Sequence, residues 1–307
     1  MKYKVLDIPS ERSSHKIPTP RGGGIAIVVS WYIGIIILYT ADLVDRKLFL
    51  ALMSGVILAV IGLLDDLYRI KPALRLMFQF ITAVIALVFI IGGDSSSFLE
   101  LDFIHPLILY TAMIIGILWF INLYNFLDGI DAYASVETMF IAITMFLFTG
   151  DIILLVLVSV VLGFIYWNWP NAKIFMGDVG STQLGFIIVI LGIYYHNTTD
   201  FKIIHWLMLS SLFWFDATFT LFRRLINGEK LGKAHKKHAY QRIVQAGFSH
   251  LKTNILALLL NLIVLIIVII SYYVRTLRIP GFLFILLLFY GITRIIDKKV
   301  PFQKESA

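Results

Sequence analysis

Long apolar runs alternate with short polar loops along almost the entire chain. An α-helix needs about 20 mostly apolar residues to cross a hydrocarbon layer roughly 30 Å thick. Runs close to that length occupy residues 23–41, 48–64, 74–91, 106–121, 132–149, 152–167, 181–196, 203–221, 254–274 and 280–296. Because no domain boundary or fixed repeat interrupts the pattern, it predicts one all-α domain over residues 1–307 with about ten transmembrane helices.

The composition supports a polytopic membrane protein. Of the 307 residues, 59% are hydrophobic and only 15% are charged, which is too apolar for a soluble globular domain. No cysteine is present, so disulfides and thiolate metal sites are excluded. The chain opens with charged residues and its first apolar run is long enough to span a membrane, so a cleavable signal peptide is not expected.

The distribution of Lys and Arg predicts the orientation. If the N-terminal segment is cytoplasmic, only five of the 26 basic residues fall on the opposite side: Arg46, Lys47, Lys202, Arg275 and Arg278. Short cytoplasmic loops are rich in Lys and Arg, so both termini are assigned to the cytoplasm. The net charge of +7 then fits anionic headgroups and substrates, and no nucleic acid partner is expected.

Two carboxylates, Asp65 and Asp66, follow directly on the second apolar run. Adjacent negative charges at a membrane boundary repel each other, so a cation or the nearby Arg69, Lys71 and Arg75 would offset them. A solvated turn that ends the helix is the alternative interpretation. The identical charges side by side favour a metal site.

Polar residues recur at steps of three in the segment 122–135. Such steps drift by about 60° on a regular helix, so the side chains face one ligand only if the backbone breaks between them. Gly129 is the expected break. The alternative is that these residues merely cap two helix ends. The four residues are Asn122, Asn125, Asp128 and Asp131.

Glycines precede the first apolar run, in the segment 12–24. A helix N-terminus binds anions through its free N–H groups and its dipole, and glycine lets the backbone approach closely. Lys16 and Arg21 are expected to grip phosphate beside the glycines at 22–24. The alternative is that the glycines only shape a loop and the basic residues only set the orientation.

Asp178 lies in a glycine-flanked turn before the seventh apolar run. The dipole of the following helix should keep this carboxylate ionised, which suits a Mg²⁺ ligand. A simple helix cap is the alternative.

A basic segment at 235–242 contains His235 and His238. Surrounding positive charge lowers a histidine pKa, which favours phosphate contact over metal ligation. A basic stripe at the lipid headgroups is the alternative. Glu137 and Asp216 fall inside predicted spans, where ionisable groups are costly and usually functional. Asp216 is nearer the cytoplasmic end and is the better site candidate.

Together, the segments 12–24, 65–66, 122–131, 171–181 and 235–242 resemble the motifs of the polyprenyl-phosphate N-acetylhexosamine-1-phosphate transferases of glycosyltransferase family 4, in family order. The resemblance implies transfer of a sugar 1-phosphate, from an N-acetylhexosamine or an amino-deoxy sugar, from a UDP-sugar to undecaprenyl phosphate with release of UMP. The lipid-linked product would initiate an O-antigen-like cell-surface glycan, in lipopolysaccharide or cell-wall synthesis, at the bacterial inner membrane.

The resemblance also implies roles for individual residues. Mg²⁺, with Mn²⁺ as a substitute, would bind at Asp178. The residues implied in catalysis are Asp65, Asp66, Asp128, Asp131, His235 and His238. Those implied in substrate binding are Lys16, Thr19, Arg21, Arg75, Asn122, Asn125, Asn168 and Asp216. A homodimer in the lipid bilayer is compatible with the family.

Two other functional classes compete with this interpretation. A transporter or flippase would place ionisable groups and broken helices near the membrane midplane, whereas here they cluster at one predicted face. The CDP-alcohol phosphotransferases also carry a DG motif, but an Arg follows it where this chain has Tyr133. Release of UMP that depends on a polyprenyl phosphate would separate both classes from the transferase.

Overall fold

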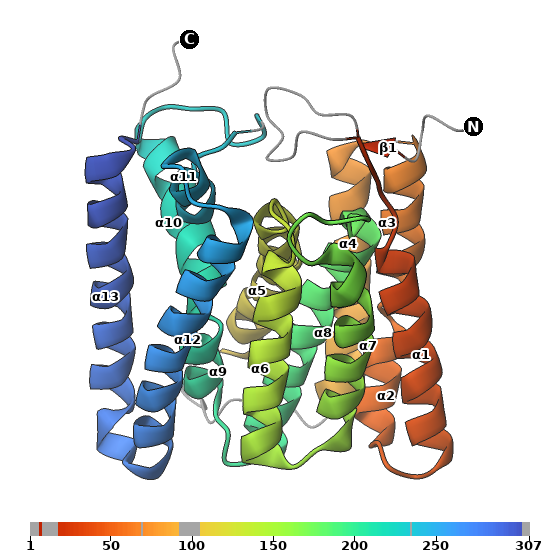
Figure 1. Cartoon of the computed structure of the whole chain (residues 1–307). Helices are drawn as coiled ribbons and strands as arrows, with labels where there is room; N and C mark the ends of the chain where they lie inside the picture. The colour runs from red at the N-terminus through yellow and green to blue at the C-terminus, as the bar shows by residue number, and fades with distance from the viewer. Residues whose placement is uncertain (1–5, 8–17, 69, 92–104, 234, 303–307) are drawn as a thin grey trace.

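The computed structural model describes residues 6–7, 18–68, 70–91, 105–233 and 235–302. Within these ranges the chain forms an upright bundle of helices that run along one common direction (Figure 1). The all-α prediction holds apart from one small ribbon, in which β1 (Leu6–Asp7) pairs antiparallel with β2 (Thr19–Pro20). Lys16 lies outside the described residues.

The helices follow the predicted apolar runs closely. Their bounds are α1 (Gly24–Thr40), α2 (Arg46–Met53), α3 (Val56–Tyr68), α4 (Pro72–Ile91), α5 (Pro106–Leu127), α6 (Tyr133–Thr149), α7 (Ile152–Asn168), α8 (Gly177–Thr198), α9 (Ile203–Leu209), α10 (Ser211–Ile226), α11 (Ala239–Gln245), α12 (His250–Tyr273), the 3₁₀ turn η2 (Arg275–Leu277) and α13 (Arg278–Lys299).

The prediction of ten spans is confirmed only in part. In the described part of the chain, six helical segments are long and apolar enough to cross a membrane: Arg46–Tyr68, Pro72–Ile91, Pro106–Leu127, Gly177–Thr198, His250–Tyr273 and Arg275–Lys299. The apolar helices α1, α6 and α7 are shorter, at 17 residues each. The predicted span 203–221 is divided at Ser210 into α9 and α10. The structure therefore supports a helical membrane protein with fewer full-length spans than predicted.

The segment Arg46–Tyr68 is itself divided into α2 and α3 at Ser54 and Gly55. Gly55 lies against α1 and α8, where an added Cβ would stand 2.7 Å from the Tyr32 hydroxyl and 2.8 Å from Nε2 of Gln183. Gln183 donates a 2.8 Å hydrogen bond to that hydroxyl. The break between α2 and α3 is therefore packed tightly against a polar contact inside the bundle.

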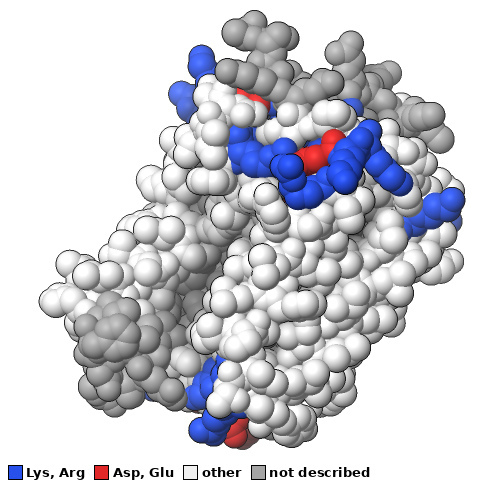
Figure 2. All heavy atoms as spheres, turned by 90° about the vertical axis from the view of Figure 1, so that its left-hand side faces the viewer, with Lys and Arg blue, Asp and Glu red and all other residues white. Residues whose placement is uncertain are grey.

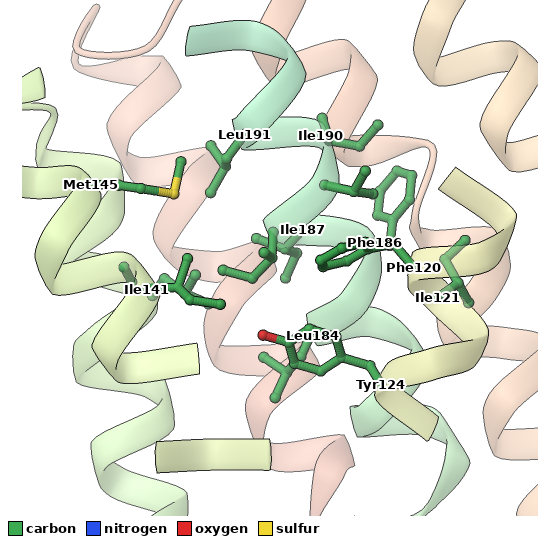
Figure 3. Close-up of a cluster of buried hydrophobic side chains, with 14 of the residues drawn as sticks. Phe120, Ile121, Tyr124, Ile141, Met145, Leu184, Phe186, Ile187, Ile190 and Leu191 are labelled. Atoms are coloured by element: carbon green, nitrogen blue, oxygen red, sulfur yellow. The ribbon is translucent and has the colours of Figure 1, made fainter. Parts of the chain in front are cut away.

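Helix α8 forms the centre of the bundle, packed against α1, α3, α5 and α6. A helix that is apolar on every side is buried in the interior, and α8 is buried over most of its length. Figure 3 shows its side chains interdigitating with those of α5 and α6. At Gly185 an added Cβ would lie 2.8 Å from the carbonyl oxygen of Phe120, so the glycine lets α5 approach α8 closely.

One end of the bundle, called the polar end below, carries the C-terminal ends of α3 and α5, the N-terminal end of α8, and α11 (Figure 1). At the end of α7, the exposed fractions of Tyr166, Trp167 and Trp169 are 73%, 52% and 47%. Exposed Tyr and Trp gather where a membrane meets water. The polar end is thus consistent with a position at a membrane surface.

Candidate active site

The carboxylate of Asp66 caps the N-terminal end of α8. It accepts hydrogen bonds from the backbone N–H groups of Asp178 at 3.0 Å and Val179 at 3.3 Å. Gly177 precedes them with a φ of +75°, and an added Cβ would lie 2.7 Å from Asp66 Oδ2. Only glycine adopts this backbone conformation without strain. The glycine before Asp178 therefore makes room for a carboxylate from another helix.

Arg75 of α4 joins Asp65 of α3 to Asp178 of α8. Its Nη1 atom lies 2.5 Å from Asp65 Oδ2 and 2.8 Å from Asp178 Oδ2. The other oxygen of Asp178 accepts a 2.9 Å hydrogen bond from Asn125 of α5, whose amide also donates to the Ser181 hydroxyl. Four helices thus place one guanidinium, two carboxylates and an amide around a common point.

A pocket opens at this point. It is bounded by these polar residues, by the predicted Asn122, and by Gln79, which was not predicted. Asn122 donates a 2.7 Å hydrogen bond to Oε1 of Gln79. Gln79 is 5% exposed, and an amide side chain within the apolar stretch 76–91 of α4 is the signal that could have identified it. The lining residues are Leu58, Ile61, Gly62, Asp65, Arg75, Gln79, Asn122, Asn125, Asp178 and Thr182.

The predicted backbone break after α5 is present between residues 128 and 132. Gly129 lies in this break, as expected, and Ala132 within it takes the left-handed conformation, with φ 64°. Its N–H donates a 2.9 Å hydrogen bond to Oδ1 of Asn168. Gly129 is needed for a different reason, because an added Cβ there would overlap the Tyr240 hydroxyl.

Asp128 ends α5 and begins this turn. Burial, together with the negative charges of Asp178, Asp66 and Asp131, raises the pKa of Asp128 well above its usual range, against the opposing charge of Arg21. The carboxylates of three separated segments are therefore near enough to repel one another. Such a group is stabilised when a cation enters.

Asp131 faces a different set of partners. Its Oδ2 atom lies 3.0 Å from Nδ1 of His250 on α12 and accepts a 3.3 Å hydrogen bond from the N–H of Ala172. Asn168, which holds Ala132, also donates from its amide to the carbonyl of Ile174 at 2.9 Å. Asp131 and Asn168 thus connect the turn to neighbouring segments.

The basic segment lies at the same end of the bundle. Asp216 on α10 caps α11 by accepting hydrogen bonds from the N–H groups of Ala239 at 2.7 Å and Tyr240 at 3.3 Å. The hydroxyl of Tyr240 donates to the carbonyl of Phe126 at 3.1 Å, which connects α11 to the end of α5. His238 is 2% exposed, with its Nδ1 3.6 Å from Asp216 Oδ1. Asp216 and His238 are therefore enclosed by the protein.

Burial and the positive charges of His238, Arg224 and Lys237 lower the pKa of His235 to about 3, in the direction predicted. With this pKa the His235 ring is neutral at pH 7, so it would contact a phosphate only as a hydrogen-bond donor. The ring centres of His235 and His238 are 4.8 Å apart. Lys and Arg gather on the adjoining surface at the polar end (Figure 2).

The first glycine segment does not provide the free helix N-terminus that was expected. The N–H groups of Gly23 and Gly24 donate to the carbonyls of Phe175 at 3.0 Å and Met176 at 2.9 Å. An added Cβ on Gly24 would lie 2.5 Å from the Cα of Gly180. These glycines therefore pack α1 against α8, and their N–H groups are already used within the protein.

The other residues of this segment lie beside the ribbon. Thr19 is buried in β2, and Arg21 pairs with Asp7 of β1 at 2.8 Å. The Arg21 side chain is 46% exposed, so it remains accessible from the polar end.

The donor set at Asp178 fits a magnesium ion shared with a phosphate ligand. Among the described residues, no three Asp, Glu, His or Cys side chains are grouped so that they could hold a metal. Mg²⁺ commonly binds one or two carboxylates and completes its shell with water and substrate phosphates. The Asp178 side chain is 29% exposed, in a pocket that also contains the Asp65 carboxylate. Asp178 and Asp65 would hold the ion, with oxygens supplied by the substrate.

The sequence of this chain is similar to a known family of membrane transferases. Residues 48–196 match the profile described as glycosyl transferase family 4. The chain is 30% identical over 268 residues to a probable undecaprenyl-phosphate N-acetylglucosaminyl 1-phosphate transferase of Bacillus subtilis (strain 168), covering 81% of this chain and 72% of the relative. It is 26% identical to a decaprenyl-phosphate N-acetylglucosaminephosphotransferase of Mycobacterium leprae (strain TN), covering 83% and 74%. It is 28% identical to a phospho-N-acetylmuramoyl-pentapeptide-transferase of Rickettsia rickettsii (strain Sheila Smith), covering 60% and 61%.

Proposed function

The chain belongs to glycosyl transferase family 4, and from this premise we propose that it transfers an N-acetylhexosamine 1-phosphate from a UDP-sugar to a polyprenyl phosphate. N-acetylglucosamine is the first candidate sugar, because two of the relatives are named for it. The products would be UMP and a polyprenyl-diphospho-sugar.

The observation that carries the proposal is the junction made by Arg75. A single guanidinium contacts carboxylates of α3 and α8, and Asn125 holds the second oxygen of Asp178. Positive charge, carboxylates and an amide at the mouth of one pocket suit a diphosphate with its accompanying cation.

In the proposed reaction, an oxygen of the lipid phosphate forms a bond to the β-phosphorus of the UDP-sugar. The bond between that phosphorus and the bridging oxygen breaks, and UMP leaves. Two anions must meet, so positioning and charge neutralisation are the main tasks of the protein. When bound, Mg²⁺ would supply charge neutralisation at the diphosphate.

The acidic residues would place substrates more than they would remove protons. The second pKa of a phosphate monoester is about 6, so the acceptor is already largely ionised at neutral pH. Asp66 holds the N-terminal end of α8, and Asp65 holds Arg75. Both carboxylates therefore support the arrangement of Asp178 and its neighbours.

An apolar pocket between α10, α11, α12 and α13 offers room for part of the isoprenoid chain. It is lined mainly by Leu, Ile, Phe and Ala side chains, with Asp216 and Tyr240 among its few polar residues. Burial of isoprenoid surface there would be favourable at about 25 cal/mol per Å².

The distribution of Lys and Arg supports a cytoplasmic position for the polar end, where a UDP-sugar is available. We further propose that the lipid-linked product initiates a cell-surface glycan at a bacterial plasma membrane, since the relatives are bacterial proteins.

A donor panel tests the proposal. Purified protein in detergent is mixed with undecaprenyl phosphate, Mg²⁺ and one of several UDP-sugars, and UMP is measured. We expect UMP from UDP-N-acetylglucosamine or a related donor only when the lipid phosphate is present. UMP release from no donor, or at the same rate without the lipid, would refute the transferase.

A further inference from the structure

The turn between α5 and α6 is strained and is held from outside. Ala132, which carries the left-handed backbone conformation, is completely buried. A residue with a Cβ persists in this conformation only when the surrounding structure holds it there. Asn168 of α7 supplies one contact to the N–H of Ala132. The neighbouring Asp131 is contacted by Ala172 and by α12, a helix outside the region that matches the family profile.

Helix α12 contacts the turn through two polar side chains. His250, its first residue, places Nδ1 3.0 Å from Oδ2 of Asp131, and Asn254 donates a 2.8 Å hydrogen bond to the Asp131 carbonyl. Residues four apart lie on the same face of a helix. Asn254 is 3% exposed and the His250 side chain 15%, so both contacts are shielded from water.

A third contact extends this face further along α12. Asn261 donates a 2.6 Å hydrogen bond to Oε2 of Glu137 on α6, and both side chains are at most 2% exposed. Polar contacts between transmembrane helices fix their relative register. The α12 face therefore holds the turn and the first part of α6 together.

Both the carboxylate and the carbonyl of Asp131 are engaged in contacts within the protein. Its carboxylate faces His250 and the N–H of Ala172, and its carbonyl accepts from Asn254. Asp128, three residues earlier, caps the C-terminal end of α5, one turn after Asn125, which lines the pocket. A shift of Asp131 would move Asp128, because the two residues share one short turn.

We propose that His250 and Asn254 are positioning residues that act through Asp131 to hold Asp128 at the end of α5, beside the substrate pocket. The inference rests on the proposed transferase function, and it assigns to Asp131 a positioning role in place of the catalytic role expected from the sequence. The Nδ1 atom of His250 is the functional atom, because it accepts a 3.4 Å hydrogen bond from the N–H of Asp131 and lies 3.0 Å from its Oδ2.

Two substitutions of His250 separate this role from simple packing. The side-chain amide of Asn occupies roughly the place of Nδ1 and can both accept from the Asp131 N–H and donate to Oδ2, whereas the amide of Gln corresponds to the place of Nε2. We expect His250→Asn to stay within about threefold of the wild-type kcat, and His250→Gln to lose about tenfold or more, as for residues that orient a metal site. The Mg²⁺ concentration for half-maximal rate should rise in the Gln variant, and KM for the lipid phosphate should not.

Lys252→Gln is the matched control, because Lys252 lies on the same turn of α12 and is exposed. For every variant, kcat is compared with the thermal unfolding midpoint measured in detergent. Equal rates for the Asn and Gln variants, or losses that follow the unfolding midpoint, would overturn the proposal. If His250→Gln does not fold, a double-mutant cycle replaces it, in which His250→Ala, Asp131→Asn and the double variant are measured. If the losses in rate of the two single variants simply add in the double variant, the proposal is also overturned.

The affinity for UDP, measured by titration calorimetry with Mg²⁺ present, gives a readout that does not require turnover. If the wild-type protein releases no UMP from any donor, the transferase proposal fails. Weaker UDP binding by His250→Gln than by His250→Asn would still support the positioning role. Equal UDP binding by the two variants would reject that role as well.

Discussion

Asp66 and Asp178 meet where the backbone N–H of Asp178 donates a 3.0 Å hydrogen bond to the Asp66 carboxylate. The neighbouring Asp65 points elsewhere, to Arg75, because successive residues on a helix are about 100° apart. Two adjacent carboxylates therefore perform different tasks. Asp66 fixes the start of α8, and Asp65 fixes the guanidinium that contacts the Asp178 side chain.

Replacement of Gly177 by Ala should damage this junction. The φ of +75° would cost a residue with a Cβ about 1–2 kcal/mol, and the added carbon would push against Asp66. We expect a lower unfolding midpoint in detergent and a lower rate of UMP release. Gly163→Ala on α7 is the control, because an added Cβ there meets nothing within 4 Å. Similar behaviour of the two variants would contradict the role given to Gly177.

Arg75→Gln should make the protein more responsive to Mg²⁺. Without the guanidinium, the carboxylates of Asp65 and Asp178 would face each other with no compensating charge. We expect the unfolding midpoint without metal to fall, and added Mg²⁺ to raise it more than in the wild type. Arg75→Lys keeps a positive charge but loses the planar geometry, so it should give an intermediate result. An equal Mg²⁺ response in all three proteins would show that these carboxylates do not share a cation.

The low pKa of His235 predicts a pH dependence of stability. The folded protein keeps this ring neutral down to about pH 3, whereas the unfolded chain takes up the proton near pH 6.5. The stabilisation is therefore complete above about pH 6.5 and is lost progressively as the pH falls toward 3. His235→Asn removes the titrating group, so its unfolding midpoint should fall less between pH 7 and pH 5 than that of the wild type. Parallel pH profiles would show that His235 is not held neutral.

The sequence was sufficient to predict the helical segments and the meeting of distant polar motifs. Apolar length alone located helices in all ten predicted ranges, since the pattern records which residues avoid water. The break after Asp128 followed from helix geometry, because steps of three cannot face one point on a regular helix.

The missed features depend on which distant segments become neighbours. Gly23 and Gly24 suggested a phosphate loop, but their N–H groups are taken by carbonyls near residue 175, about 150 positions away in the chain. Likewise, the left-handed backbone at Ala132 is held by Asn168 of α7 and by the α12 contact to the neighbouring Asp131. No local pattern reveals such partners.

The central claim is that Asp178 holds the divalent cation at which the UDP-sugar reacts. The most direct test is the rate of UMP release as a function of Mg²⁺ concentration for the wild type, Asp178→Asn and the control Asp200→Asn, an exposed residue in the loop before α9. Asn preserves the size of the side chain and the acceptor for Asn125 but removes the charge. We predict that Asp178→Asn loses about 10- to 100-fold in rate or in apparent Mg²⁺ affinity, while Asp200→Asn does not change. Wild-type turnover and Mg²⁺ dependence in Asp178→Asn would contradict the account.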